Sequence, residues 1–570
     1  MSGPGDRTSK NTKSPEPTRS DTAEGHDSPA DNVERGLGSS GRGHGVRHAI
    51  KRLMHGNRET SGEPDARERE GQVREGMSHN PQQYPEESDA VDVPTWKKST
   101  KARVTPDESM EGRTAANEEV APRNTSRAQD RHDVLTHLER LGRRAEEQKE
   151  ERFGNLLSHI KVPLLREAYA RLSKKAAPGV DGETWSTYGE NLDARLLDLQ
   201  ERVQRGSYHP QPVRRVHIPK GDGRTRPLGI PSLEDKIVQQ AARMLLEPIY
   251  ERMFVGFSYG FRPGRSQHDA LDALAVAISK RVDWVLDADI RAFFDTIDHA
   301  WMKKLIEHRI ADRRMVRLLM KWLHAGVMED GELRDVTEGT PQGGIISPLL
   351  ANLYLHYVLD LWVLQWRRTQ ARGEMYVVRY ADDFVMGFQR ESDARAMRAA
   401  LAERLAHFGL ELHPDKTRVI RFGRFAHRDS GLDGRTRPET FDFLGFTHIV
   451  ALDPQGRSRL IRRTSRKKRL AKLSALRADI RARRHEPPRV QHAWLSSVLR
   501  GHDNYYGVPS NFAALRSFHH QVRRMWHGAL QKRSQRARWT AVQRSRFDER
   551  FPLPPPRITR PIPQLRPSTR

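Results

Sequence analysis

Residues 375–388, MYVVRYADDFVMGF, decide the fold of this chain. Two runs rich in apolar, aromatic and β-branched residues flank a polar centre, which predicts a β-hairpin with Ala381, Asp382 and Asp383 at or beside its turn. An Asp pair in a turn is ordinary turn chemistry when it stands alone, because aspartate bonds its own backbone there. Between apolar arms the pair has a second interpretation, because adjacent carboxylates repel each other and a cation relieves that repulsion.

A third aspartate strengthens the second interpretation. The run WVLDAD at residues 284–289 predicts another strand, which ends in Asp289. Mg²⁺ suits a site of one or two carboxylates completed by water and substrate phosphates. Two such ions about 3.5–4 Å apart would activate a 3′-hydroxyl and stabilise a departing pyrophosphate.

The composition points to a polyanionic partner. The 570 residues include 99 Lys+Arg and 74 Asp+Glu, a net charge of +25, and 36% are hydrophobic. This length fits several domains, or one large domain with disordered flanks. The chain contains no Cys, which excludes disulfides, Cys-ligated zinc, iron–sulfur clusters and thiol catalysis.

The composition also divides the chain. Residues 1–130 have only Tyr84 and Trp96 as aromatics, so a disordered extension is expected there. Short β-like runs alternate with amphipathic helices in residues 131–450, a basic helical region follows in 451–545, and a proline-rich tail in 546–570 is expected to be disordered. The N-terminus has no apolar signal region and no apolar run is long enough to span a membrane, so we expect a cytoplasmic protein without membrane contact.

Further motifs occur in chain order around the three aspartates. They are PGVDG at 178–182, RPLGIP at 226–231, YGFRPGRS at 259–266, GTPQGGIISP at 339–348, GLELHPDKT at 409–417 and FDFLGF at 441–446. Together with Tyr380-Ala381-Asp382-Asp383 they resemble the ordered motifs of bacterial group II intron reverse transcriptase–maturases, over about residues 150–530. The resemblance implies an α+β right-hand polymerase, with fingers and palm in 131–450 and an α-helical thumb/maturase domain in 451–545.

The resemblance also implies an active site. Asp289, Asp382 and Asp383 would be catalytic and would hold two Mg²⁺ ions, with the carbonyl of Ile290 as an additional ligand. Lys416 would lie near the nascent strand.

A dNTP carries about four negative charges that need neutralising. Arg214, Lys220 and Arg226 surround a Gly-Asp-Gly turn and are expected to bind the triphosphate from a two-stranded fingers hairpin. The alternative is a solvated basic hairpin.

Two further residues are expected at the nucleotide. Phe294 would pack beneath the sugar and exclude a 2′-hydroxyl, unless Phe293 and Phe294 simply face the core. Gln342 lies in a Pro-Gln-Gly-Gly turn whose backbone can approach a nucleotide closely.

Primer and RNA contacts are expected towards the C-terminus. Phe443, Leu444 and Gly445 resemble the primer grip, although they and Lys416 could equally be ordinary structure. The segment RGHDNYY at 500–506 resembles the maturase core, where Trp is more usual than His502. The expected RNA-binding residues are Arg466, Lys467, Lys468, Arg500, Asn504, Tyr505 and Tyr506.

The implied partners are group II intron RNA, an RNA template with a DNA primer, and dNTP. Because many relatives end in a Cys-containing endonuclease and this chain has no Cys, no endonuclease is expected. Three alternatives stay open: a domesticated or defence-associated reverse transcriptase without an intron partner, a maturase with an inactive polymerase, and an electrostatic RNA chaperone. The intact aspartates argue against the last two.

Overall fold

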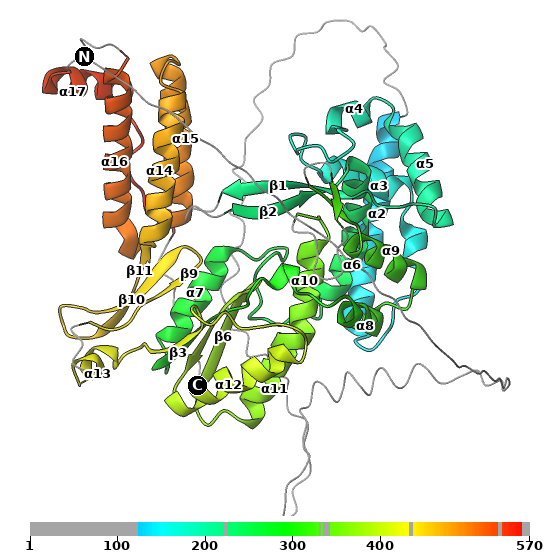
Figure 1. Cartoon of the computed structure of the whole chain (residues 1–570), viewed down its shortest axis with the longest axis horizontal. Coiled ribbons are helices and arrows are strands. Elements are labelled where there is room, and N and C mark those ends of the chain that lie inside the picture. The colour runs from blue at the N-terminus through cyan, green and yellow to red at the C-terminus, as the bar shows by residue number, and fades with distance from the viewer. Residues whose placement is uncertain are drawn as a thin grey trace, which may run out of the picture. The chain divides into compact units, whose positions relative to one another are not determined.

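A four-stranded antiparallel sheet carries the predicted hairpin. The computed structural model (Figure 1) describes residues 123–219, 225–329, 332–334, 343–432, 437–533 and 539–560. The central sheet has the order β6-β7-β3-β8. Its strands are β3 (Trp284–Asp289), β6 (Met375–Tyr380), β7 (Asp383–Phe388) and β8 (Arg418–Arg421). Strands β6 and β7 pair with Tyr380 opposite Asp383, which confirms the hairpin.

Strand alternation separates the two faces of this sheet. Leu286 and Met386 belong to the larger core, together with the apolar face of α12 (Glu391–Ala406). Val285 and Val385 belong to a second core, which includes α7 (Gln267–Ile278). Because successive side chains of a strand point to opposite faces, the odd-numbered aspartates of β3 and β7 share the face of Val285 and Val385.

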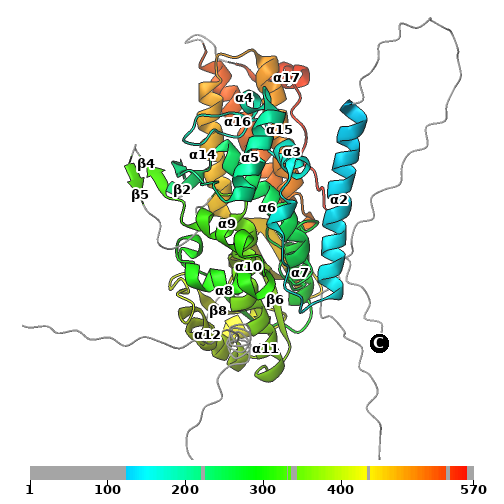
Figure 2. The same ribbon diagram turned by 90° about the vertical axis from the view of Figure 1, so that its right-hand side faces the viewer.

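Helices between Arg123 and Thr369 build most of the larger core. Helix α2 lies alongside α3 and α6 (Figure 2). The helices are α2 (Arg123–Glu147), η1 (Leu157–His159), α3 (Val162–Arg171), α4 (Trp185–Gly189), α5 (Leu192–Arg205), α6 (Leu233–Glu251), η2 (Phe293–Asp295), α8 (His299–Arg309), α9 (Arg313–Leu323), α10 (Ser347–Leu355), the π-helical turn η3 (His356–Asp360) and α11 (Leu361–Thr369).

A second sheet lies between these helices and the site described below. Its order is β2-β1-β4-β5, and β1 and β2 form an antiparallel hairpin. The strands are β1 (Val213–Pro219), β2 (Thr225–Ile230), β4 (Val327–Glu329) and β5 (Glu332–Arg334). The expected two-stranded element around Gly221–Gly223 is thus confirmed in its strands, while Lys220–Arg224 lie outside the described residues.

The C-terminal region combines a small sheet with long helices. The sheet β11-β10-β9 leads into α14, and α14, α15 and α16 form a separate core around Leu476, Leu499 and Trp526. The elements are α13 (Ala426–Leu432), β9 (Phe441–Phe443), β10 (Phe446–Leu452), β11 (Ser458–Thr464), α14 (Arg466–Ala482), α15 (Pro488–Tyr506), η4 (Pro509–Asn511), α16 (Phe512–Gln531) and α17 (Ala541–Arg550).

Both expected disordered ends need correction where the structure describes them. Residues 123–130 are the first turns of α2 rather than part of a disordered extension, and residues 1–122 lie outside the described chain. The tail expected from residue 546 is wrong for 546–560. Helix α17 continues to Arg550, and the following segment hydrogen-bonds to α15 and α16 through His492, Asp503 and His519.

The mixture of helices and strands confirms the α+β class. Within the described part of the chain, no helix is long and apolar enough to cross a membrane.

Candidate active site

Asp289 and Asp383 lie opposite each other at the ends of two paired strands. Strands β3 and β7 are antiparallel, and these two residues are the last partners of their register. Asp382 occupies the turn just before β7, where Ala381 has a left-handed φ of 58°. The alternation of each strand places the carboxylates of Asp289 and Asp383 on one face of the sheet.

This turn opens into a large cleft. The cleft has a volume of about 940 Å³, and Ala381, Asp382 and Asp383 form part of its lining. Its other walls come from β2, from Gly343 and Gly344 before α10, from the turn after β9, and from helices α14 and α15. The three sequence-predicted aspartates therefore lie at or beside this cleft.

Lys416 packs against the end of β3. Its ammonium group forms an ion pair with Asp289, and the backbone N–H of His413 donates to the carbonyl of Asp289 at 2.8 Å. Since alternate carbonyls of an extended strand point to opposite edges, the carbonyl of Ile290 faces the other edge, on the side where β7 begins.

Crowding of carboxylates changes their acidity. Removal from bulk water and, after it, the nearby charges of Asp382 and Asp289 together raise the pKa of Asp383 to about 7, while Lys416 opposes the shift. Burial likewise raises the pKa of Asp287 to about 6, against the lowering effect of Arg418. A cation beside these groups would relieve the repulsion that contributes to the two raised pKa values.

The donor set suits a hard divalent cation, although the side chains do not form a ready metal cage. Among the described residues, no group of three or more His, Cys, Asp or Glu side chains is arranged to hold a metal ion. The ammonium of Lys416 lies against Asp289, where it supplies a positive charge. Carboxylate and carbonyl oxygens are the ligands that Mg²⁺ prefers, so the residues present fit that ion.

The predicted triphosphate-binding residues are only partly placed. Arg214 is half-buried on β1, and its guanidinium donates to the carbonyl of Pro178 at 2.7 Å. Arg226 lies on β2 opposite Ile218, with its side chain outside the described residues. Lys220 and Gln342 also lie outside them. Leu228, which lies on β2 with Arg226, does line the cleft.

Phe294 lies in the cleft wall. It belongs to η2, which follows a left-handed Ala292 with φ of 46°. Phe294 lines the cleft, while Phe293 packs on Tyr354 at a centroid distance of 6.4 Å. Both rings belong to the larger hydrophobic core, and of the two only Phe294 also lines the cleft.

Leu444 and Gly445 form a tight turn between β9 and β10 that faces the cleft. Both residues have positive φ, 46° and 79°. Tyr505 donates its hydroxyl hydrogen to the carbonyl of Leu444 at 2.8 Å, and a Cβ on Gly445 would lie 3.0 Å from the Tyr506 hydroxyl oxygen. Phe443 is buried in the core beneath. Of the predicted primer-grip residues, Leu444 and Gly445 thus form the turn, and Phe443 supports it from the core.

The predicted RNA-binding residues fall into two groups. Arg466, Lys467 and Lys468 are exposed in the first turn of α14, and Lys468 reaches the cleft. Arg500 and Asn504 are exposed on α15. Tyr505 and Tyr506, by contrast, are half-buried against Phe446 and the Leu444–Gly445 turn.

His502 replaces the more usual Trp without leaving a gap. Its ring is buried and stacks on Phe518 at a centroid distance of 3.8 Å. Burial lowers its pKa to about 4, so the ring is neutral at physiological pH and serves as an aromatic core group.

Phe261 and Asp442 are among the residues of the cleft that sequence reasoning did not assign to the site. Phe261 lines it with 49% of its surface exposed and with a left-handed φ of 58°. Asp442 lines it too, where its carboxylate accepts hydrogen bonds from Thr447 and Ser465. The signals were an aromatic residue enclosed by the glycines of YGFRPG and a polar residue between two phenylalanines.

Comparisons with known proteins agree with this geometry. Residues 218–448 match the family described as reverse transcriptase (RNA-dependent DNA polymerase). Protein YkfC of Escherichia coli K12 is 38% identical over 308 residues, which cover 47% of this chain and 80% of YkfC.

Proteins named after introns are also similar to this chain. Group II intron-encoded protein LtrA of Lactococcus lactis is 39% identical over 234 residues, 41% of this chain and 39% of LtrA. Nuclear intron maturase 4 of Arabidopsis thaliana is 26% identical over 240 residues, 40% of this chain and 28% of the maturase. The chain therefore spans less than half the length of these two relatives.

Proposed function

Because the chain belongs to the reverse transcriptases of the group II intron-encoded type, we propose that it copies RNA into DNA at the Asp289, Asp382 and Asp383 site. The observation that carries this proposal is the register of β3 and β7. It brings Asp289 opposite Asp383 beside a cleft of about 940 Å³ whose lining also includes Leu444 and Gly445.

The proposed layout assigns each wall of the cleft a part of a right hand. The central sheet and its helices form the palm, and the β1–β2 hairpin with the preceding helices forms the fingers. The small sheet β9–β11 and helices α14–α16 form the thumb and maturase domain. Leu228 of β2 and Lys468 of α14 both line the cleft, which supports two walls closing over one palm.

The proposed mechanism relies on what each residue holds. Mg²⁺, when bound, would lower the pKa of the primer 3′-hydroxyl and neutralise charge on the triphosphate. Asp289, Asp382 and Asp383 would bind the two ions together with the Ile290 carbonyl. Phe294 would hold the sugar face of the dNTP, and Leu444 and Gly445 would hold the primer end. Lys416, whose ammonium group forms an ion pair with Asp289, would lie near the nascent strand.

We also propose that the chain binds group II intron RNA, in addition to an RNA template, a DNA primer and dNTP. Three basic residues are exposed on α14 and α15, namely Arg466, Lys467 and Arg500. Exposed positive charges of this kind bind RNA phosphates. The similarity to a protein named intron-encoded and to one named intron maturase supports this partner.

Primer extension tests the polymerase proposal. Wild-type protein with Mg²⁺, dNTP and a DNA primer on an RNA template is expected to make cDNA, and the double variant Asp382→Ala/Asp383→Ala is expected to make none. Equal inactivity of both proteins would contradict the polymerase reading. Splicing of the flanking intron RNA by the double variant would show that RNA binding is separable from DNA synthesis.

A domesticated or defence-associated reverse transcriptase without an intron partner is the second candidate. The same cDNA synthesis would then occur, but RNA transcribed from the sequence around the gene would neither splice nor bind more tightly than an unrelated RNA of equal length. Binding measured at two salt concentrations separates specific recognition from simple phosphate binding, which falls steeply with salt.

The Leu444–Gly445 turn predicts a primer-binding defect. Gly445→Ala places a methyl group 3.0 Å from the Tyr506 hydroxyl oxygen at a φ of 79°, so the turn must shift. We expect the Kd for primer–template to rise about 10-fold, which corresponds to about 1.4 kcal/mol, because a turn displaced by this contact holds the primer less well. Fluorescence anisotropy of a labelled duplex measures it.

Gly456→Ala is the matched control for this variant. Gly456 has a φ of 76° and open space around its Cβ position, so it carries the same backbone strain without a clash. An equal loss of primer affinity in both variants would show that backbone strain alone weakens binding, against a specific role for the turn.

A further inference from the structure

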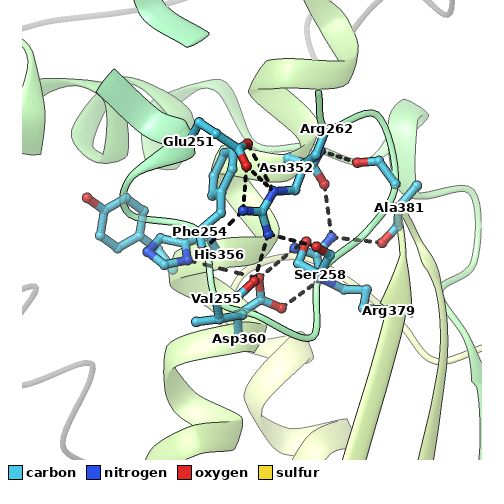
Figure 3. A network of polar contacts seen from close by, with 12 residues as sticks. Glu251, Phe254, Val255, Ser258, Arg262, Asn352, His356, Asp360, Arg379 and Ala381 are labelled. Carbon is cyan, nitrogen blue, oxygen red and sulfur yellow. Dashed lines mark hydrogen bonds and ion pairs between the residues drawn. The ribbon is translucent and has the colours of Figure 1, made fainter. Parts of the chain in front are cut away.

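A buried arginine supports the turn that carries Asp382 and Asp383. Arg379 is the penultimate residue of β6 and is fully buried. Its guanidinium lies among acceptors from four separate segments, and Figure 3 shows them converging on it. They are Asp360 of η3, Asn352 of α10, Ser258 of the loop after α6, and the carbonyl of Ala381 in the turn itself.

Every donor of this guanidinium is used. Nε and Nη2 donate to the two carboxylate oxygens of Asp360, at 2.7 and 2.5 Å. Nη1 donates to Asn352 and to the Ala381 carbonyl, both at 3.0 Å, and Nη2 also donates to the Ser258 hydroxyl at 2.7 Å. An arginine has five N–H donors in a fixed plane, so these bonds define the position of each acceptor.

The Ala381 carbonyl is the informative acceptor. Ala381 has a left-handed φ of 58°, a conformation that an L-residue adopts only when its surroundings impose it. Gly260 closes the opposite side, since a Cβ there would lie 2.3 Å from the Ala381 nitrogen. Asn352 links the two sides, because it accepts from Arg379 and donates to the Gly260 carbonyl at 2.7 Å.

The loop on the Gly260 side is fixed by a second arginine. Arg262 is buried, forms an ion pair with Glu251, and donates to the carbonyls of Val255 and Ser258 at 2.7 Å. Ser258 therefore joins the two arginines, through its carbonyl to Arg262 and through its hydroxyl to Arg379. The Ala381 turn is therefore supported by η3 and α10 through Arg379, and by α6 through Glu251, Arg262 and the loop that contains Gly260.

We propose that Arg379 is a positioning residue for catalysis, which fixes the Ala381 backbone and so aims the carboxylates of Asp382 and Asp383 at the metal positions. The proposal rests on the proposed polymerase function. Its basis is geometric: Arg379 is fully buried and does not line the cleft, but it bonds the residue directly before the two carboxylates.

Arg379→Lys tests the proposal, because it keeps the charge and loses the planar fork. We expect kcat for RNA-templated synthesis to fall about 10- to 100-fold, the effect of a displacement near 1 Å at reacting groups. The Mg²⁺ concentration for half-maximal rate is expected to rise several-fold. The Kd for primer–template is expected to stay within about 2-fold, because the cleft walls that hold the duplex keep their residues.

Arg309→Lys is the matched control. Arg309 is equally buried and donates to the carbonyls of Ala145 and Glu151, so the change removes a comparable buried fork far from the turn in sequence. We expect a similar drop in Tm with kcat per folded molecule and Mg²⁺ dependence unchanged. Parallel losses of kcat and unchanged Mg²⁺ dependence in both variants would overturn the positioning role.

A milder variant covers the case in which Arg379→Lys does not fold. Asn352→Ala removes one acceptor of Arg379 and the bond to the Gly260 carbonyl while leaving the ion pair with Asp360. It too should raise the Mg²⁺ requirement, and an unchanged requirement would count against the proposal. Inactive wild-type protein would instead refute the polymerase function itself, so the two failures are distinguishable.

Discussion

Replacing Asp383 with Asn should reduce RNA-templated DNA synthesis at least about 10³-fold, because the variant loses a carboxylate from a site in which charge stabilisation supplies most of the rate. The replacement keeps the shape of the side chain and its place opposite Asp289. Single-nucleotide incorporation at saturating dNTP and Mg²⁺ measures the loss, and Mn²⁺ is expected to restore only a small part of it.

The same variant should be more stable than wild type when no metal is present. The folded protein raises the pKa of Asp383 to about 7 from 3.8, so its charged form is disfavoured by folding. Stability from this group is complete below the unfolded pKa and is lost as the pH rises towards 7. Above pH 7 in EDTA, Asp383→Asn should gain about 1 kcal/mol, a value discounted because the side chain is solvent-accessible.

Asp287→Asn is the control for the loss of activity. Asp287 shares the strand and face of Asp289, and burial raises its pKa to about 6, yet its ion-pair partner is Arg418. This variant is expected to lose activity only a few-fold. Activity of Asp383→Asn within about 10-fold of wild type would exclude this carboxylate from metal binding. A fall in its stability above pH 7 would contradict the repulsion argument.

The local sequence pattern predicted the strands that carry the three aspartates. The contacts that support the Ala381 turn depend instead on tertiary packing. Alternating apolar residues in 375–388 and 284–289 were sufficient for the hairpin and for a strand ending in Asp289, because side-chain alternation is a local property. The partners of Arg379 lie on three other segments, so no local pattern indicates them. Phe261 was not predicted for the same reason, because its exposure depends on how its loop packs beside the Ala381 turn.

The roles expected for the basic and aromatic residues stay predictions. A carboxylate beside other carboxylates has few roles, whereas the guanidinium of Arg214 could bind phosphate and also donates to the carbonyl of Pro178. Tyr505 and Tyr506 were expected to contact RNA; both line the cleft and also contact the Leu444–Gly445 turn, so this expectation stays a prediction.

The proline-rich tail shows that amino-acid composition alone does not predict which segments pack against the fold. Its backbone groups find partners on α15 and α16, which a count of prolines cannot reveal. Arg557 donates its backbone N–H to Asp503 at 3.1 Å, and His519 bonds the carbonyl of Pro554 at 3.1 Å.

Replacing Phe294 with Leu should weaken discrimination against ribonucleotides about 10- to 100-fold. Phe294 lines the cleft, and its position is fixed because Phe293 stacks on it edge-to-face at 5.4 Å and packs in turn on Tyr354. A hydroxyl pressed against such a wall costs about 1–3 kcal/mol, and each 1.4 kcal/mol is a factor of ten. The ratio of kcat/KM for a dNTP and the matching ribonucleotide measures the effect.

Phe293→Leu separates this role from packing. Both phenylalanines are buried and adjacent, but only Phe294 lines the cleft. Phe293→Leu should lower Tm while leaving the dNTP preference unchanged, because its ring faces the core. If Phe294→Leu lowers kcat/KM for both nucleotides equally, the residue supports the fold of the cleft rather than selecting the sugar. If Phe293→Leu alone relaxes selection, the wall that meets the sugar is built by the other ring.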